Sequence, residues 1–354
     1  MHRREFLKTT GAAAAAGLAT GTATREAAGD VLPAPQIVTA PRLELVLATP
    51  SPLELPGVGE AARRLAKRIT AASEGTMRLL IDERPESSVE LIATGQADLT
   101  FANEVSNRDH DRAFTFFGGL PGAAGLMPDE HCAWLAGGAQ ALWDELAAGF
   151  GMKPLLAGHT GVMPGLWSRT PFVADARRLD GLAVFTRGLG NDAAAGLGAE
   201  FVHIPAAEIP ARFAAGTLDM AEWAGPFASL ALGLDTFANH FYAGGFHPAG
   251  FALTLGVRRR LWDRLAPADR AMVEAIAAHE HRLALAEALS NDARALEILG
   301  GARGVSLHPW PAALGRALAT VSADRIAELA RSSPLAGRIA ASHARARGMR
   351  RALA

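Results

Sequence analysis

The stretch HFYAGGFHPAGFALTLG, residues 240–256, decides how the chain is organised. It is an apolar, extended stretch that follows one set of predicted strands and helices and precedes a helical last third. A comparable set of strands and helices lies near the N-terminus. The stretch therefore predicts a crossing from the second set back to the first, so that shared strands join two α/β units.

The first set occupies residues 42–103. Three apolar segments predict strands, and two segments with helical spacing, each closed by a glycine, predict the helices between them. The strands are 42–49, 77–82 and 97–103, and the helices are 58–75 and 87–95. Strands that alternate with helices at this spacing are typical of a parallel sheet with crossover helices.

The second set repeats this order over residues 152–226. Its strands are 152–158, 178–185, 200–205 and 218–226, and its helices are 190–198 and 206–216. Residues 161–171 predict an irregular link. From Ala266 the chain is predicted to be helical, and Gly300 with Gly301 ends a long helix.

These elements predict an α/β chain with two lobes. Lobe 1 is expected to contain residues 42–160 and about 245–265, and lobe 2 residues 161–244 and about 266–354. Ligands of such sheets bind beyond the carboxyl ends of the strands, at the points where the connections change direction. We therefore expect a ligand between the two lobes.

The N-terminus predicts export. Arg3 and Arg4 precede Phe-Leu-Lys and an Ala-rich run, which is the pattern of a twin-arginine signal. The apolar run is too short and too rich in Ala and Gly to span a bilayer stably. Residues 1–28 therefore predict the signal, 29–41 a Pro-rich linker, and the mature protein a periplasmic location. The alternative is a buried Ala-rich helix, and the cleavage site stays open.

Composition and motifs narrow the function further. The formal net charge of −1 does not suggest a nucleic-acid binder, and the single Cys132 excludes an intrachain disulfide. The chain has no dinucleotide fingerprint, no phosphate-binding loop and no nucleophile elbow. We therefore expect neither a cofactor nor an enzymatic activity.

The middle of the chain resembles the periplasmic solute-binding proteins of tripartite ATP-independent periplasmic (TRAP) transporters, of the DctP-like family. The resemblance is closest to the branch that binds 2-oxo acids and related monocarboxylates. It rests on Thr160-Gly161-Val162, Trp167 with Arg169, Gly181-Leu182, Gly216-Thr217-Leu218-Asp219 and Glu222-Trp223-Ala224-Gly225-Pro226. It implies a two-lobed periplasmic binding-protein fold, with mixed or parallel sheets, flanking helices, crossing strands and a long helix. It also implies delivery of a small solute to TRAP permease subunits in the membrane.

The chain departs from the family pattern at the ligand site. The resemblance places Phe185 where the family has the arginine that binds the ligand carboxylate. Met163 stands in place of a loop glutamine. Pro248 stands where the 2-oxo-acid branch has a glutamate that helps Glu222 hold a cation. Glu222 is therefore the one metal ligand that the resemblance implies here, in a cation site that is incomplete.

Two arginines are candidates to replace the missing arginine that binds the ligand carboxylate. Arg187 lies two residues beyond Phe185, and alternation along a strand makes both side chains face the same way. The alternative is a solvated arginine at the start of a helix. Arg108 follows the third strand, close to Asn103, and its alternative is a salt bridge with Asp109 or Asp111.

The remaining candidates come from the later strands. Glu222 and Trp223 are predicted to line the ligand pocket, with a core tryptophan beside a capping glutamate as the alternative. Phe185, Met163 and Phe246 would make the pocket more apolar than is usual, or belong to the core. His247 is either a polar pocket residue or a surface histidine.

The sequence therefore predicts an exported solute-binding protein. Its ligand is expected to be a monocarboxylate held by a displaced Arg187, or a more apolar neutral compound. The chain stops at HARARGMRRALA, short of a dimerising helix present in some relatives, so a monomer is expected. The alternatives are an exported sensor, an apolar-ligand carrier on the same fold, and an exported enzyme.

Overall fold

The computed structural model describes residues 43–172 and 178–351 of the chain. The predicted export signal and linker lie outside these residues. Among the described residues, no helix combines the length and the apolar character needed to cross a membrane. These described residues form one compact unit.

The first sheet has the strand order β2-β1-β3-β10-β4. Its strands are β1 (Leu43–Thr49), β2 (Met77–Glu83), β3 (Leu99–Ala102), β4 (Met152–His159) and β10 (Ala252–Arg258). β1 is parallel to β2 and β3, whereas β10 runs antiparallel to β3 and β4. The sheet is therefore mixed, because a strand from the second half of the chain enters it.

The second sheet has the strand order β11-β9-β5-β8-β6-β7. Its strands are β5 (Gly165–Ser168), β6 (Ala183–Phe185), β7 (Glu200–Phe201), β8 (Met220–Trp223), β9 (His240–Ala243) and β11 (Ser306–Pro309). β6 is parallel to β7 and β8, and β5 is antiparallel to β8 and β9. Each sheet with the helices packed on it is called lobe 1 or lobe 2 below.

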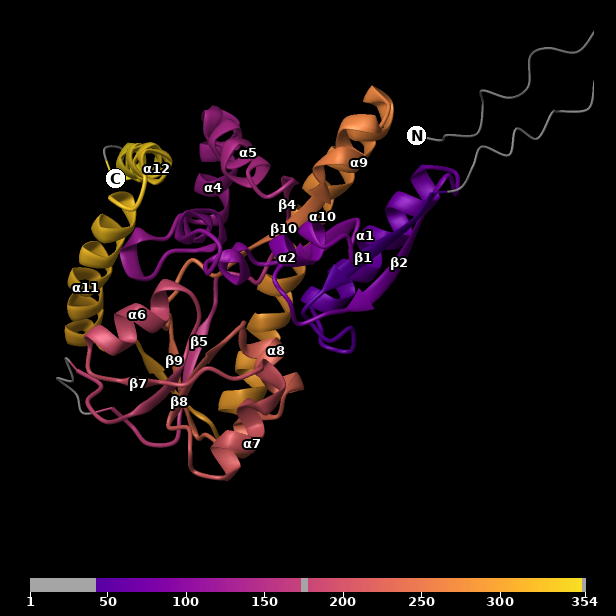
Figure 1. The fold of residues 1–354 in the computed structure, drawn as a ribbon. Helices are drawn as coiled ribbons and strands as arrows, with labels where there is room; N and C mark the ends of the chain where they lie inside the picture. Colours follow the sequence, from indigo (N-terminus) through magenta and orange to yellow (C-terminus); the bar gives the residue numbers. More distant parts are fainter. Residues whose placement is uncertain (1–42, 173–177, 352–354) are drawn as a thin grey trace, which may run out of the picture. The chain divides into compact units, whose positions relative to one another are not determined.

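The helices cover these sheets and connect them (Figure 1). They are α1 (Val58–Ala72), α2 (Ser88–Ala93), α3 (Thr115–Gly118), α4 (Pro128–Trp134), α5 (Gln140–Ala148), α6 (Leu189–Gly196), α7 (Ile209–Ala214), α8 (Pro226–Ala231), α9 (Arg259–Arg264), α10 (Pro267–Gly300), α11 (Ala312–Ala330) and α12 (Pro334–Arg351). Two short 3-10 turns, η1 (Glu104–Asn107) and η3 (Gly122–Ala124), are also used below.

Two of the passages between the sheets run in adjacent segments, residues 160–164 and 244–251. The predicted crossing is confirmed, since residues 240–256 hold β9 of one sheet and β10 of the other. The two segments bond to each other: Thr160 N donates to Phe251 O at 3.0 Å, and Phe251 N donates to Thr160 Oγ1 at 2.9 Å. Gly250 lies in this contact with a φ of +69°.

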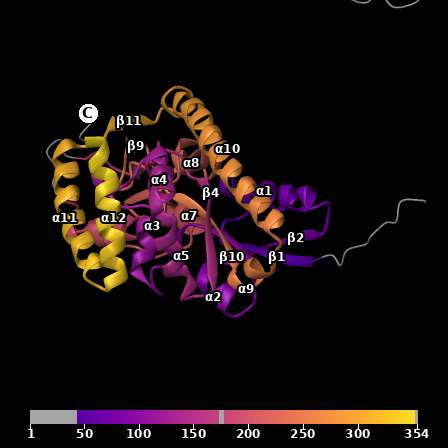
Figure 2. The same cartoon turned by 90° about the horizontal axis from the view of Figure 1, so that it is seen from above.

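The long helix α10 contacts both lobes. It packs against β4 and α1 on one side and against α8 on the other. Figure 2 shows it running past both α8 and α1. Its residues Val273 and Ala277 belong to the lobe 1 core, and Leu299 belongs to the lobe 2 core.

The last two helices divide between the lobes, which differs from the expectation that residues 266–354 belong to lobe 2. α11 packs against α6 of lobe 2, whereas α12 packs against α4 and α5 of lobe 1. The reason is apolar burial, because Ala336 and Ile339 of α12 join a cluster with Phe116 and Trp134.

Two strands were not predicted. Residues 161–171 contain β5, which lies between β8 and β9, and the last third contains β11, which pairs with β9. Both strands have four residues, and their sequences carry no alternation long enough to predict a strand. Pairing with partners far along the chain forms them.

Candidate ligand-binding site

The site forms where β6 and β8 end side by side. The two strands are parallel, with Val184 opposite Met220 and Phe185 opposite Ala221. Continuing this register by one and two residues brings Thr186 beside Glu222 and Arg187 beside Trp223. Parallel pairing thus places two polar pairs at the same edge of the sheet.

Glu222 is the centre of a buried polar network. Its Oε2 accepts a hydrogen bond from Thr186 Oγ1 at 2.5 Å and lies 2.7 Å from His247 Nδ1. Its Oε1 accepts from the backbone N–H of His247 at 2.7 Å. The Glu222 residue is only 3% exposed and His247 is fully buried. Three donors therefore satisfy one carboxylate.

The network keeps Glu222 ionised. Burial alone raises the pKa of a carboxyl group, because it removes water from the charged form. In Glu222 the charge attraction and hydrogen bonds from His247, with the hydrogen bond from Thr186, outweigh burial and hold the pKa below its ordinary value. An ionised carboxylate only accepts hydrogen bonds, so His247 Nδ1 carries the proton in this contact.

The backbone around the network requires glycine at two positions. A Cβ on Gly245 would lie 2.6 Å from Glu222 Oε1, and one on Gly190 would lie 2.5 Å from His247 Cε1. His247 also packs against Phe251, with ring centroids 4.4 Å apart. Close packing on every side therefore fixes the position of the His247 ring.

Arg187 has a different environment. Its side chain is exposed, and its guanidinium carbon lies 5.3 Å from the centre of the Trp223 ring. None of the described residues forms an ion pair or hydrogen bond with this guanidinium. Surrounding protein lowers its pKa, although water still reaches the group and no neighbouring carboxylate raises the pKa again. Arg187 is thus a cation without a counter-charge among the described residues.

Trp223 adds a second unused donor. Its Nε1 is buried and has no hydrogen-bond partner among the described residues. Buried polar groups are normally paired, so an indole N–H left unpaired beside an unpaired guanidinium points to a ligand with acceptor atoms.

The apolar candidates lie elsewhere. Phe185 is 4% exposed in the lobe 2 core, and Phe246 is fully buried against Trp310 with ring centroids 5.8 Å apart. Met163 is half-buried in the segment between β4 and β5. Both phenylalanine rings pack in the core of lobe 2, which agrees with the alternative that these side chains belong to the core.

Asn103 and Arg108 have structural partners. Asn103 caps η1, with its Oδ1 accepting from Val105 N at 2.7 Å and its Nδ2 donating to Ala252 O at 2.7 Å. Arg108 pairs with Asp192 of α6 at 3.1 Å and donates to the carbonyl of Gly188. The suggested partners Asp109 and Asp111 are thus replaced by a residue of the other lobe.

Sequence reasoning missed Thr186 and Asp292. Thr186 shows its role only in the β6–β8 register. Asp292 of α10 is 2% exposed and accepts from Phe227 N, in the first turn of α8, at 3.0 Å. A Cβ on Gly225 would lie 2.0 Å from Asp292 Oδ2, which explains the glycine after Trp223-Ala224. Burial raises the pKa of Asp292 to about 6.

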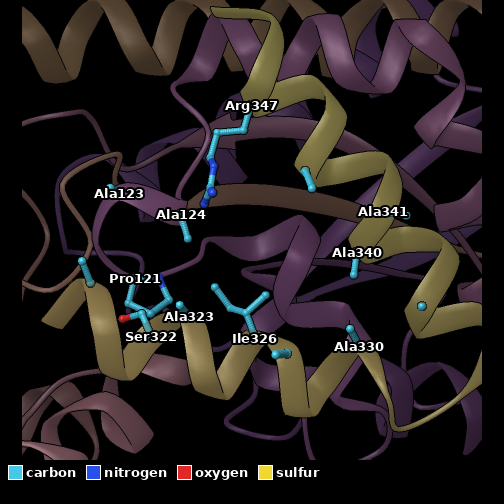
Figure 3. A pocket seen from close by; sticks show the side chains of 14 residues that line it. Pro121, Ala123, Ala124, Ser322, Ala323, Ile326, Ala330, Ala340, Ala341 and Arg347 are labelled. Carbon is cyan, nitrogen blue, oxygen red and sulfur yellow. The ribbon is translucent and has the colours of Figure 1, made fainter. Parts of the chain in front are cut away.

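A cavity of about 550 Å³ lies away from these residues, between η3, α11 and α12 (Figure 3). Its lining is mainly alanine from both helices, with Ser322, Ile326 and Arg347. None of the predicted site residues lines it. The polar candidate residues gather instead around Arg187 and Trp223, and such groups are what usually set ligand specificity.

The N-terminus and the whole chain both match known proteins. Residues 1–20 match the family described as the TAT (twin-arginine translocation) pathway signal sequence. The chain is 27% identical over 336 residues to a monocarboxylate 2-oxoacid-binding periplasmic protein of Nostoc sp., which covers 92% of this chain and 88% of that protein. The predicted export to the periplasm by the twin-arginine route is therefore confirmed.

Solved structures share the fold. A TRAP periplasmic solute-binding protein from Colwellia psychrerythraea, with bound calcium and pyruvate, matches with a TM-score of 0.82 and 21% identity, over 88% of this chain and 96% of that one. A TRAP transporter solute-binding protein from Bordetella bronchiseptica, described as a dimer with calcium and picolinate, matches with a TM-score of 0.81 and 24% identity, over 88% and 94%. Both are solute-binding transport proteins. The export signal, the sequence similarity and the shared two-lobed fold together show that the chain is similar to the periplasmic solute-binding proteins of TRAP transporters.

Proposed function

We propose that this protein captures a small monocarboxylate of the 2-oxo-acid class and delivers it to the membrane subunits of a TRAP permease. The observation that carries the proposal is the exposed guanidinium of Arg187, which has no counter-charge among the described residues. A planar guanidinium binds a carboxylate through two parallel hydrogen bonds, and each such charge-assisted bond is stronger than a neutral one.

The neighbouring groups suit the rest of such a ligand. A 2-oxo acid has a keto oxygen beside its carboxylate, and the unpaired Nε1 of Trp223 is a donor that such an oxygen can accept from. The similarity to a monocarboxylate 2-oxoacid-binding protein supports the same ligand class. The apolar alternative loses support, because Phe185 and Phe246 pack in the core.

A pair of ligands and a pair of variants test the role of Arg187. Pyruvate should raise the melting temperature of the wild-type protein, whereas methyl pyruvate, its uncharged ester, should not, because only a bound ligand stabilises the folded state. Arg187→Ala should weaken pyruvate binding by about 10- to 100-fold, from the loss of a hydrogen bond to a charged group. Isothermal titration calorimetry measures both affinities.

Arg212→Ala is the matched control, since Arg212 is an exposed arginine of lobe 2 that pairs with Glu208 on the same helix face. It should bind pyruvate as the wild type does. If Arg187→Ala binds pyruvate with unchanged affinity, or if methyl pyruvate stabilises the protein as well as pyruvate does, Arg187 is not the carboxylate-binding residue. The expected monomeric state stays a prediction, which light scattering on the purified protein checks.

A further inference from the structure

The buried network at Glu222 bears on a question that the similar structures raise. Two of them hold calcium together with their organic ligand. The family resemblance makes Glu222 the cation ligand of this chain. We propose that His247 takes the place of the calcium ion here, so that the protein binds its solute without calcium.

The first argument is the occupancy of the carboxylate. Three donors already reach the Glu222 oxygens, at 2.5, 2.7 and 2.7 Å. Calcium requires six to eight oxygen ligands at about 2.3–2.6 Å. A cation at these oxygens would have to displace Thr186 Oγ1 or His247 Nδ1, because both donors lie where a metal ion would lie.

The second argument is access. The Glu222 residue is 3% exposed, and the backbone at Gly245 packs so closely that a Cβ there would lie 2.6 Å from Oε1. Water molecules are among the usual ligands of protein-bound calcium, and this buried, closely packed carboxylate is shielded from solvent. The surroundings of Glu222 therefore do not fit a hydrated divalent ion.

The third argument is the lack of partner ligands. Within residues 43–172 and 178–351, no group of three or more histidine, cysteine or acidic side chains is arranged to hold a metal ion. Met163 and Pro248 stand at the positions where the resemblance expects an amide and a second carboxylate, and neither side chain is an oxygen ligand. Asp292 Oδ1 accepts from Phe227 N at the start of α8.

His247 is suited to replace an ion because the chain itself holds it in place. Its backbone N–H and its ring both bond to Glu222, and its ring packs on Phe251 and against Gly190. His247, fixed in the segment between the lobes, thus binds the Glu222 carboxylate in place of a calcium ion. The calcium concentration should therefore not affect solute binding.

The first experiment uses the metal alone and does not depend on the identity of the solute. The melting temperature of the wild-type protein is measured after EDTA treatment and again with 1 mM CaCl₂. We expect no shift in the wild type. His247→Ala removes the ring donor and opens space at Oε2, so CaCl₂ should raise the melting temperature of this variant by several degrees, as a ligand of the folded state does.

The second experiment adds pyruvate and rests on the proposed function. Its affinity for the wild type should agree within a factor of two in EDTA and in CaCl₂. Failure of pyruvate to bind under either condition would count against the proposed function alone, because the calcium shifts are read without it.

Two results would overturn the inference. One is a saturable rise in the wild-type melting temperature with CaCl₂; the other is a His247→Ala protein that folds and stays insensitive to calcium. If that variant does not fold, native mass spectrometry of the wild-type chain with one equivalent of CaCl₂ decides. A specific calcium adduct contradicts the proposal, and its absence supports it.

Discussion

Gly250→Ala should destabilise the protein by about 3–5 kcal/mol and lower its melting temperature by roughly 10 °C. Gly250 has a φ of +69°, where a Cβ is strained, and an ideal Cβ would lie 1.9 Å from the carbonyl oxygen of Gly161. That oxygen belongs to the backbone of the other crossing segment, so no side-chain rotation can relieve the overlap. Relief requires separation of the two segments, which breaks their contact at Thr160 and Phe251. Thermal and urea unfolding measure the loss.

Gly244→Ala is the control for Gly250→Ala, because it introduces the backbone strain without the steric overlap. Gly244 also has a positive φ, of +110°, but its Cβ would lie 3.6 Å from Trp310 Cβ, an ordinary contact distance. This variant should lose only about 1–2 kcal/mol, the cost of the left-handed backbone alone. Equal losses in the two variants would show that the contact between the crossing segments contributes nothing to stability.

Glu104→Gln should remove a large pH-dependent loss of stability. Burial raises the pKa of Glu104 to about 7, although hydrogen bonds from Asn107 and Trp143 partly oppose it. The folded state therefore prefers the protonated carboxyl, while the unfolded chain ionises near its ordinary value of 4.5. Stability from this group is present below pH 4.5 and is lost as the pH rises towards 7, by about 3 kcal/mol in total.

The comparison between variant and wild type isolates this effect. Burial lowers the pKa of His131 and His159 to about 3, and these residues change stability in the opposite direction as the pH rises. The free energy of unfolding is therefore measured by urea titration for both proteins at pH 5 and pH 8. Between pH 5 and pH 8, the difference between the two proteins should change by about 2.5 kcal/mol in favour of Glu104→Gln. Glu54→Gln, at a side chain that is 91% exposed, should follow the wild type; a parallel profile for Glu104→Gln would contradict the prediction.

The fold was predictable where hydrophobic patterns were long. Residues 240–256 predicted the crossing between sheets, and the order of strands and helices predicted two α/β lobes. The short strands β5 and β11 were not predictable, because four residues carry too little pattern and their partners lie far along the chain. The packing of α12 on lobe 1 likewise depends on contacts that no local pattern contains.

The site was predictable in part. Glu222, Trp223 and Arg187 were candidates because they follow neighbouring strands, and the structure does bring them together. Thr186 was missed, because its approach to Glu222 depends on the exact register of β6 against β8. Phe185 and Phe246 could not be assigned from the sequence, because an apolar side chain suits a pocket and a core equally well. Only the direction in which the backbone points the side chain decides between the two.

Ion pairing shows the same dependence on distance along the chain. Arg108 has acidic neighbours at 109 and 111, yet it pairs with Asp192, 84 residues away. The sequence shows which charges are close along the chain, whereas the fold decides which are close in space.

The long helix α10 has a consequence for how the protein unfolds. Its 34 residues contribute to the hydrophobic cores of both lobes. If α10 separates from either lobe, the hydrophobic core of that lobe is exposed to water. Because the same helix also completes the core of the other lobe, that core is destabilised as well. The lobes are therefore not separate folding units. The mature protein should unfold in a single cooperative transition, despite having two sheets.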